Sequence, residues 1–423
     1  MKNIIFTLLL STSLLLLPVE GFAQDDADEL RHVFVTALER NPDIQAALAS
    51  VNIAKGNLLQ ARLRPNPEAT VEMENFGGND QFSGTGMAEV TYGIEQELEI
   101  GGKRRYRREV ANYELQITQE QTIADILGIL ANIHQAYAEL NIAHQRLNLA
   151  EKRLELANKT HLAVKGRVKA AAASDIQHTK VDIEQQAAEI EKTAALEIFE
   201  SSKARFERLL SGNVDELGFE YKPLLTVIDL PEKEDLLAAI QEYPLALIAG
   251  LKRLQSKSRI DLARANAIPN PRLGLGVRRF NETNSNALIA SISIPLPFFN
   301  RNQGNIASER AKSFKAEYEA EAAILSLKES AELIYAQILA ASNAVKRYQD
   351  EIIPSALRAY NQASEGYGLG RFSFLELLDA QRTLYEMQEA HLNSLLQFHK
   401  AKAQVDFLMS AHAELIQQTI SLK

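Results

Sequence analysis

The chain has 423 residues and a formal net charge of −9, and 46% of its residues are hydrophobic. It has no Cys and no Trp, which excludes disulfide bonds, thiolate metal sites and a lipid-bearing N-terminal cysteine. The acidic balance argues against a nucleic-acid partner, because neutralising phosphates requires clustered Lys and Arg.

Residues 1–23 are predicted to be a secretory signal peptide. Lys2 supplies the basic start, residues 4–17 form an apolar run, and Gly21-Phe22-Ala23 offers small residues for cleavage. The alternative is an N-terminal membrane anchor, but the apolar run is shorter than the roughly 20 residues that a spanning helix needs. We therefore expect an exported chain.

Residues 24–213 are predicted to form a first structural repeat. Its helical start, residues 28–63, has a break at Asn41-Pro42, where proline cannot continue a helix. Residues 65–100 alternate between polar and apolar side chains on either side of a Gly-rich turn, which predicts a β-hairpin. A very long helix over residues 103–165, a turn over 166–174 and a second helix to Leu210 complete this half.

The first hairpin has one apolar and one acidic face. Ala69, Val71 and Met73 alternate with Thr70, Glu72 and Glu74, and the second arm repeats the pattern. A soluble, half-buried sheet gives such alternation, and so does a transmembrane strand between lipid and a watery lumen.

After a connector, residues 214–231, the same order is predicted again in residues 232–423. Pro269-Asn270-Pro271 repeats Pro65-Asn66-Pro67 at the entry to a second hairpin, residues 269–299. A long helix over residues 302–363 with a possible kink at Pro354, a turn over 365–373 and a last helix to Ala411 follow.

The repeat favours the membrane interpretation of the hairpins. Two hairpins supply four strands, whereas the smallest membrane barrels have about eight. Lipid does not tolerate open strand edges. If the hairpins lie in a membrane, several chains must therefore pool their strands.

Four stretches carry a resemblance to a known family. These are the tandem Pro-Asn-Pro entries, QELEIGGKRR at residues 96–105, and YGLGRFSFLELLDAQRTLYEMQ at residues 367–388. Together they resemble the TolC-like outer-membrane efflux proteins over essentially the whole mature chain. Pro65-Asn66-Pro67 followed by VEMENFGG and the Gly-Gly-Lys-Arg corner is similar to the cobalt-zinc-cadmium branch.

The resemblance implies a mixed α/β membrane protein with an internal tandem repeat. It implies a homotrimer in which each chain gives four strands to one transmembrane β-barrel of about twelve and four rods to a long α-helical barrel in the periplasm. Such a channel lies in outer-membrane lipid and meets a periplasmic adaptor and an inner-membrane proton-driven transporter. It needs no cofactor and is not an enzyme.

The resemblance also implies site residues at the periplasmic tip. Glu376 and Asp379 match an acidic pair that forms the pore constriction, where a trimer makes rings of three carboxylates. The structural alternative is a solvated helix face. The gate and adaptor-contact residues that the resemblance indicates are Tyr367, Arg371, Arg167, Ser174 and Ser373. Phe372 stands where some relatives have arginine, and alanines replace the usual glycine of the first tip.

No metal site is predicted from the eight histidines, because none pairs with another at the i, i+4 spacing. They are His32, His134, His144, His161, His178, His391, His399 and His412. The acidic face of the first hairpin, opposed by Arg272 and Arg278 on the second, predicts a mild cation preference at most.

Three functions remain open at this point. The first is a passive outer-membrane duct for heavy-metal cations. The second keeps the duct but changes its cargo to drugs or to a protein secreted by a type I system. The third is a periplasmic coiled-coil adaptor or structural protein, which explains the helices but not two similar hairpins.

Overall fold

The computed structural model describes residues 24–416, except 172, 217–218 and 225–229. The predicted signal peptide lies outside the described residues, as does part of the predicted connector. Among the described residues, no helix has both the length and the apolarity needed to cross a membrane.

The first half consists of two shorter helices, two strands and two long helices. They are α1 (Gln24–Arg40), α2 (Pro42–Arg62), β1 (Glu68–Glu74), the 3-10 helix η1 (Asp80–Phe82), β2 (Glu89–Glu97), α3 (Lys103–Lys169) and α4 (Asp175–Leu210).

The second half has a similar order of elements. They are α5 (Lys233–Ala239), α6 (Pro244–Asn266), β3 (Arg272–Phe280), β4 (Ser285–Ser293), α7 (Gln303–Arg347), the π-helical turn η2 (Tyr348–Ile352), α8 (Ile353–Gly368) and α9 (Phe374–Leu408).

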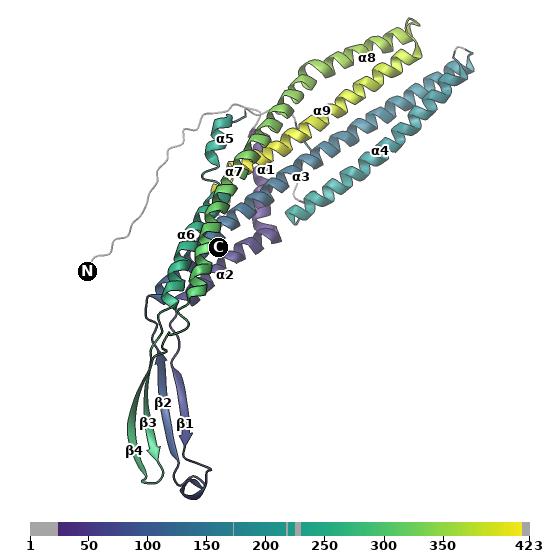
Figure 1. Ribbon diagram of the computed structural model, residues 1–423. Coiled ribbons are helices and arrows are strands. Elements are labelled where there is room, and N and C mark those ends of the chain that lie inside the picture. The colour runs from purple at the N-terminus through teal and green to yellow at the C-terminus, as the bar shows by residue number, and fades with distance from the viewer. Residues whose placement is uncertain (1–23, 172, 217–218, 225–229, 417–423) are drawn as a thin grey trace.

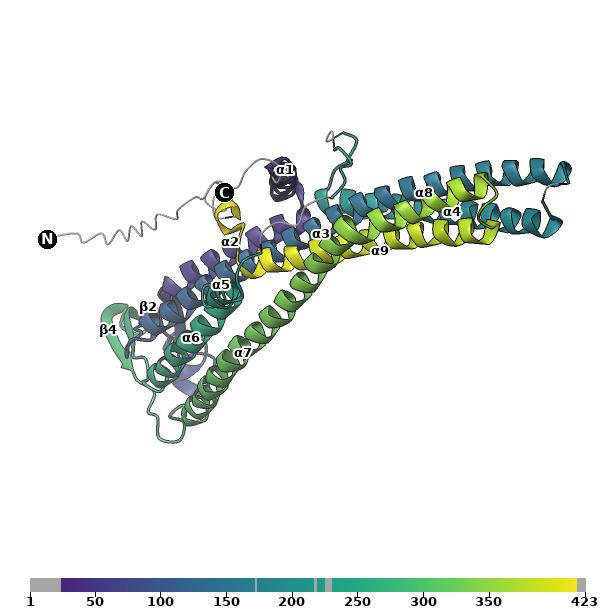
Figure 2. The ribbon, with the colours of Figure 1, turned by 90° about the horizontal axis from the view of Figure 1, so that it is seen from above.

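The molecule is elongated, with the strands at one end and the tips of two helical pairs at the other (Figure 1). The pairs are α3 with α4 and α8 with α9. Seen from above, α6 and α7 lie side by side in the part nearer the sheet, and the two pairs extend beyond them (Figure 2). The sheet and the tips are therefore at opposite ends of the chain's helical part.

The predicted break at Asn41-Pro42 is confirmed. Asn41 is the N-cap of α2, and its side-chain oxygen accepts hydrogen bonds from the backbone N–H groups of Asp43 and Ile44. Its amide nitrogen donates to the carbonyl of Leu209 at 2.7 Å. The cap thus also ties α2 to the end of α4.

The core lies midway along the molecule, where α1, α3, α4 and α9 meet. Phe34, Phe206, Phe398 and Ile133 are fully buried there, together with other residues of the same cluster. The predicted long helix is confirmed and is longer than expected: α3 has 67 residues, which at 1.5 Å per residue is about 100 Å.

The second long helix is interrupted where the sequence predicted only a possible kink. α7 ends at Arg347, the π-helical turn follows, and Pro354 lies in the first turn of α8. Proline has no N–H group and clashes with the carbonyl four residues earlier, so the helix changes its hydrogen-bond register just before it.

The tip turns are shorter than predicted, because α3 continues to Lys169 and α8 to Gly368. Gly166 and Gly366 remain helical. A glycine inside a helix costs only about 1 kcal/mol relative to alanine, which tertiary packing along the rods can offset.

The four strands form one antiparallel sheet in the order β1-β2-β3-β4. β2 and β3 join the two halves of the chain, with Glu97 opposite Arg272 and Glu89 opposite Phe280. β1 and β4 are the edges and have no outer partner within the described part of the chain.

Candidate functional site

One face of the sheet is apolar and exposed. The register aligns Val71, Tyr92, Val277 and Leu288 in one row across all four strands. These side chains are 69%, 58%, 42% and 87% exposed. A soluble sheet would bury this face against a core. Such exposure of apolar side chains is instead typical of a surface that contacts an apolar environment.

Exposed apolar side chains also follow β4, in the segment that leads to α7. Leu296, Phe298 and Phe299 are 68%, 70% and 94% exposed. Isolated exposed apolar residues are ordinary, but many of them on one face of a sheet and in the adjoining segment are typical of an interaction surface for protein or lipid.

The opposite face of the sheet is polar and carries an excess of acid. Arg278 donates to Glu89 at 3.0 Å and to the hydroxyl of Thr91 at 2.9 Å, and its Nη2 lies 2.8 Å from Glu74. Arg272 lies 4.0 Å from both Glu68 and Glu97.

Two further glutamates of the polar face, Glu72 and Glu95, have no cation within ion-pair distance among the described residues. The two arginines that the sequence placed on this face therefore neutralise part, and not all, of its charge.

Two glycines on the polar face lie in close contact with the neighbouring strand. A Cβ atom on Gly93 would lie 2.7 Å from the hydroxyl of Thr70, and one on Gly276 would lie 2.8 Å from the carbonyl of Tyr92. Both distances are too short for a side chain. A side chain at either position would displace its neighbour on the adjacent strand, and glycine avoids this contact.

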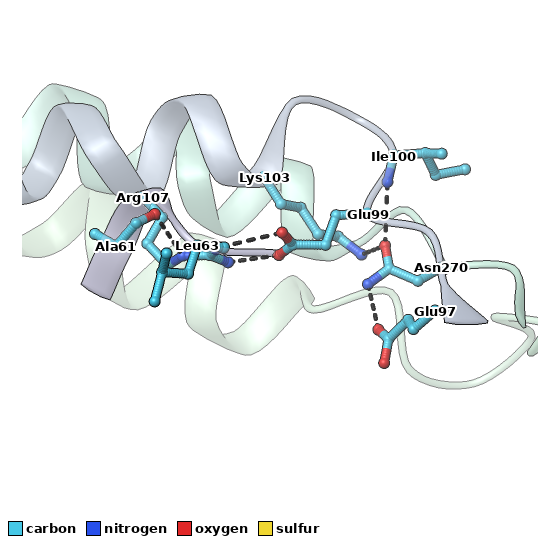
Figure 3. A network of polar contacts seen from close by, with 8 residues as sticks. All are labelled: Ala61, Leu63, Glu97, Glu99, Ile100, Lys103, Arg107 and Asn270. Atoms are coloured by element: carbon cyan, nitrogen blue, oxygen red, sulfur yellow. Dashed lines mark hydrogen bonds and ion pairs between the residues drawn. The ribbon is translucent and has the colours of Figure 1, made fainter. Parts of the chain in front are cut away.

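A network of polar contacts joins the sheet to the helices (Figure 3). Arg107, in the second turn of α3, forms a bidentate ion pair with Glu99 and donates to the carbonyls of Ala61 and Leu63 at 3.1 and 2.9 Å. The hydrogen bond from Arg107 lowers the pKa of Glu99.

Asn270 extends this network across the two halves of the chain. It is the middle residue of the second Pro-Asn-Pro entry, and its side chain donates to Glu97 at 2.6 Å and accepts from Lys103 at 2.6 Å. The same oxygen lies 3.4 Å from the backbone nitrogen of Ile100. The repeated motif thus fixes the corner at which β2 becomes α3.

The two helical tips contact each other through an aromatic ring. The guanidinium of Arg167 on α3 lies 4.9 Å from the centre of the Tyr367 ring on α8. The ring also lies beside Phe374, with the ring centres 5.8 Å apart. The buried hydroxyl of Tyr367 has no hydrogen-bond partner in the described chain. Two residues predicted for the tip, Arg167 and Tyr367, are therefore brought together.

The turns of the two tips correspond in position. Ser174 is the N-cap of α4 and Ser373 the N-cap of α9. Three residues before each serine the backbone is left-handed, at Ala171 (φ 55°) and Gly370 (φ 73°). The alanine adopts a conformation that favours glycine, so the first tip is strained where the second is not.

The second tip is also shaped by Phe372. A Cβ on Gly366 would lie 2.1 Å from the Phe372 ring, so the ring sits directly on the helix backbone. The carbonyl of Gly366 accepts hydrogen bonds from the backbone nitrogens of Arg371 and Phe372. The side chain of Arg371 is exposed.

The structure assigns Glu376 a role in the helix. Its carboxylate accepts from the backbone nitrogen of Ser373 at 2.6 Å, while its own N–H donates to the Ser373 hydroxyl at 3.3 Å, which is a capping box. The bond from the Ser373 backbone lowers the pKa of Glu376. Asp379, one turn further along α9, is exposed in the single chain.

The histidines are less scattered than the sequence spacing suggested. His134 and His399 have ring centres 6.0 Å apart in the central core. His161 on α3 and His178 on α4 have ring centres 5.3 Å apart, and both contact Asp182. The two histidines are 17 positions apart and are brought together by the pairing of α3 with α4. The i, i+4 spacing rule applies within one helix and therefore does not detect this proximity.

The sequence matches a known family along most of its length. The family model described as Outer membrane efflux protein matches residues 33–211 and 239–411. The chain is 28% identical over 370 residues to the cobalt-zinc-cadmium resistance protein CzcC of Cupriavidus metallidurans, with 87% of each chain covered. It is 26% identical to the nickel and cobalt resistance protein CnrC of the same organism, covering 75% of this chain and 76% of that one.

The fold also matches solved structures. The CmeC outer membrane channel of Campylobacter jejuni superposes with a TM-score of 0.76 at 14% identity, covering 98% of this chain and 94% of that one. At such identity the similarity concerns the fold alone.

Proposed function

Because this chain belongs to the outer membrane efflux protein family, we propose that it is the outer-membrane channel of a tripartite efflux system and conducts metal cations passively out of the cell. The observation that carries the proposal is the orientation of the two faces of the sheet. Its apolar side chains face outward, as those of a strand in lipid do, and its charged side chains face the other way.

The proposed assembly is a homotrimer with one shared β-barrel and one helical barrel. A sheet of four strands with two open edges is not stable in lipid, because unpaired backbone groups there cost several kcal/mol each. Pairing β4 of one chain with β1 of the next removes both edges, and three chains supply twelve strands.

The proposed partners meet the opposite end of the molecule. The tips of α3–α4 and α8–α9 point away from the sheet (Figure 1), and we propose that they contact a periplasmic adaptor, through which an inner-membrane proton-driven transporter delivers the cargo. Tyr367, Arg371, Arg167, Ser174 and Ser373 are the residues proposed for the gate and this contact.

The proposed cargo follows from the named relatives. CzcC is a cobalt-zinc-cadmium resistance protein and CnrC a nickel and cobalt resistance protein. The acid excess on the polar face of the sheet is compatible with cations. Glu376 and Asp379 are proposed as a constriction near the tip, where three copies of each would form rings. Drugs or a secreted protein are the alternative cargo.

Two measurements test the proposal. Deleting the gene should reduce the tolerance of the cell to Co²⁺, Zn²⁺ or Cd²⁺ and leave tolerance to hydrophobic drugs unchanged. The reverse pattern would show that drugs, and not metal cations, are the cargo. The purified protein should insert into planar bilayers as a cation-selective pore. A soluble rod that never inserts would overturn the channel itself.

A further inference from the structure

A cluster of three metal-ligating side chains lies near the tip of the α3–α4 pair. His161 comes from α3, and His178 and Asp182 come from successive turns of α4. Nε2 of His161 lies 2.7 Å from Oδ1 of Asp182, and Nδ1 of His178 lies 3.1 Å from Oδ2 of the same carboxylate. One ligand atom from each residue lies within 4.8 Å of the other two.

The two histidines occupy positions in the seam between the helices. On α3, His161 follows buried Ala157 by four residues and precedes buried Val164 by three, which is the spacing of a coiled-coil seam. On α4, His178 precedes buried Val181 by three residues. Polar residues at seam positions lower stability, so their presence here calls for a compensating interaction.

The surroundings leave the cluster accessible to a small ion. The side chains of His161, His178 and Asp182 are 15%, 30% and 36% exposed. On the side away from the tip the seam continues with a neutral amide pair, in which Gln185 donates to Asn158 at 2.7 Å. On that side the cluster is thus bounded by side chains without charge.

We propose that His161, His178 and Asp182 bind a divalent transition-metal cation of the Zn²⁺, Co²⁺ or Ni²⁺ class. Two imidazoles and one carboxylate are ligands that these ions accept, whereas Mg²⁺ and Ca²⁺ prefer sites made of oxygen alone. Tetrahedral Zn²⁺ with bonds of about 2.0–2.1 Å needs its ligand atoms about 3.3 Å apart, so small side-chain rotations convert the Asp182 contacts into coordination.

The site would be open and exchangeable. Three protein ligands leave the fourth position of a tetrahedral ion to water, unlike the closed four-ligand sites that serve structure. A bound ion connects α3 to α4 through side chains from both helices. This inference does not rest on the proposed cargo, since binding to the purified protein is measured without transport.

The test is a titration of the purified, full-length protein, prepared without a polyhistidine tag. Co²⁺ is added, its visible absorption is followed, and Zn²⁺ is then used to displace it. We expect one Co²⁺ per chain, released by one equivalent of Zn²⁺. H161Q and D182N should each weaken binding about tenfold or more, since even changes around a metal's direct ligands have effects of 10–100-fold.

The matched control is H32Q, which removes an exposed histidine on α1 outside the cluster and should leave the titration unchanged. Circular dichroism and oligomeric state are compared for every variant, so that a folding defect is not taken for lost binding. Absence of stoichiometric binding by the native protein, or binding as strong in H161Q and D182N, would overturn the proposal and leave the cluster a hydrogen-bonded seam only.

Discussion

Arg167 and Tyr367 are 200 residues apart in the sequence, yet the guanidinium of the first lies 4.9 Å from the ring centre of the second. The contact joins the tip of α3–α4 to the tip of α8–α9. Val164 and Val181 of the first pair pack with Phe374 of the second to form a small cluster beneath it. The two tips are therefore held together within one chain.

Removing this contact should loosen the tips. A cation–π pair contributes about 0.5–1 kcal/mol at an exposed site and about 2 kcal/mol when desolvated. We expect Y367A and R167A each to raise the open probability in single-channel recordings. Y367F keeps the ring and should match the native protein, because the hydroxyl has no partner in the described chain. Opening by Y367F would show that the hydroxyl bonds to a neighbouring subunit.

The proposed acidic constriction can be tested without disturbing α9. Glu376 forms the capping box, and glutamine serves at the same position, so the double change E376Q/D379N removes both charges and keeps the cap. Cation selectivity should fall, with trimer stability unchanged. E376A/D379A is the comparison, and it should also reduce thermal stability. Equal selectivity in native protein and E376Q/D379N would contradict the assignment.

The strained first tip predicts a stabilising substitution. Ala171 has φ 55°, where Gly370 of the second tip has φ 73°. A left-handed conformation costs a non-glycine residue about 1–2 kcal/mol, so A171G should slow proteolytic cleavage at this turn. G370A, at the corresponding position, should accelerate cleavage of its own turn. A neutral result for both would mean that the backbone angles do not limit tip stability.

The register between neighbouring chains follows from the register within one chain. Glu95 faces Gly274 in the β2–β3 pair. In the repeat, Ser293 of the second hairpin corresponds to Glu95 of the first. Likewise, Thr70 of the first hairpin corresponds to Gly274 of the second. Pairing of β4 with the next β1 should therefore place Ser293 opposite Thr70.

The chain has no cysteine, so this register can be tested by disulfide formation. T70C/S293C should form covalent trimers on oxidation, because opposite residues in antiparallel strands have Cα atoms about 4.5–5.5 Å apart. T70C/S285C places the second cysteine at the other end of β4 and should stay monomeric in denaturing gels. Crosslinking of the control pair alone would reject the proposed pairing.

Acid should destabilise the central core. Burial, together with a smaller effect of the Lys402 charge, lowers the pKa of His399 to about 4. Burial, then the neighbouring His399 and Lys402, lowers the pKa of His134 well below its usual value, and Asp406 lies 4.0 Å from His134. Below the ordinary histidine pKa of 6.5 the unfolded chain binds protons that the folded chain does not, so the free energy of unfolding falls as pH decreases toward 4.

The expected loss from His399 is on the order of 2 kcal/mol between pH 7 and pH 4.5. Thermal midpoints measured across this range should fall less in H399L than in the native protein. H32Q, which changes an exposed histidine, should follow the native curve. Parallel curves for H399L and the native protein would show that this side chain is not the source of acid sensitivity.

Much of the fold was predictable from local patterns, because helices and hairpins are encoded within a few residues. The alternation around Val71 and Tyr92 predicted the apolar and the polar face of the first hairpin. Asn41-Pro42 predicted the boundary between two helices. The π-helical turn before Pro354 was not predictable, because proline indicates a disturbance but not the form that it takes.

The site residues were predictable only in part. The resemblance indicated Tyr367 and Arg167 separately, but their contact depends on how two helical pairs meet. The capping role of Glu376 was readable from Ser373 three residues earlier. His161 and Asp182 lie on different helices, and only the pairing of α3 with α4 brings them together.

The polar corner around Asn270 and Arg107 couples the sheet to the helices. Its bonds come from both halves of the chain just where β2 becomes α3, so we expect the strands and the adjoining helical segments to move together. A displacement of the tips relative to the sheet must then be taken up further along the helices. There α3 and α9 are continuous, and the helix formed by α7 and α8 contains the π-helical turn before Pro354.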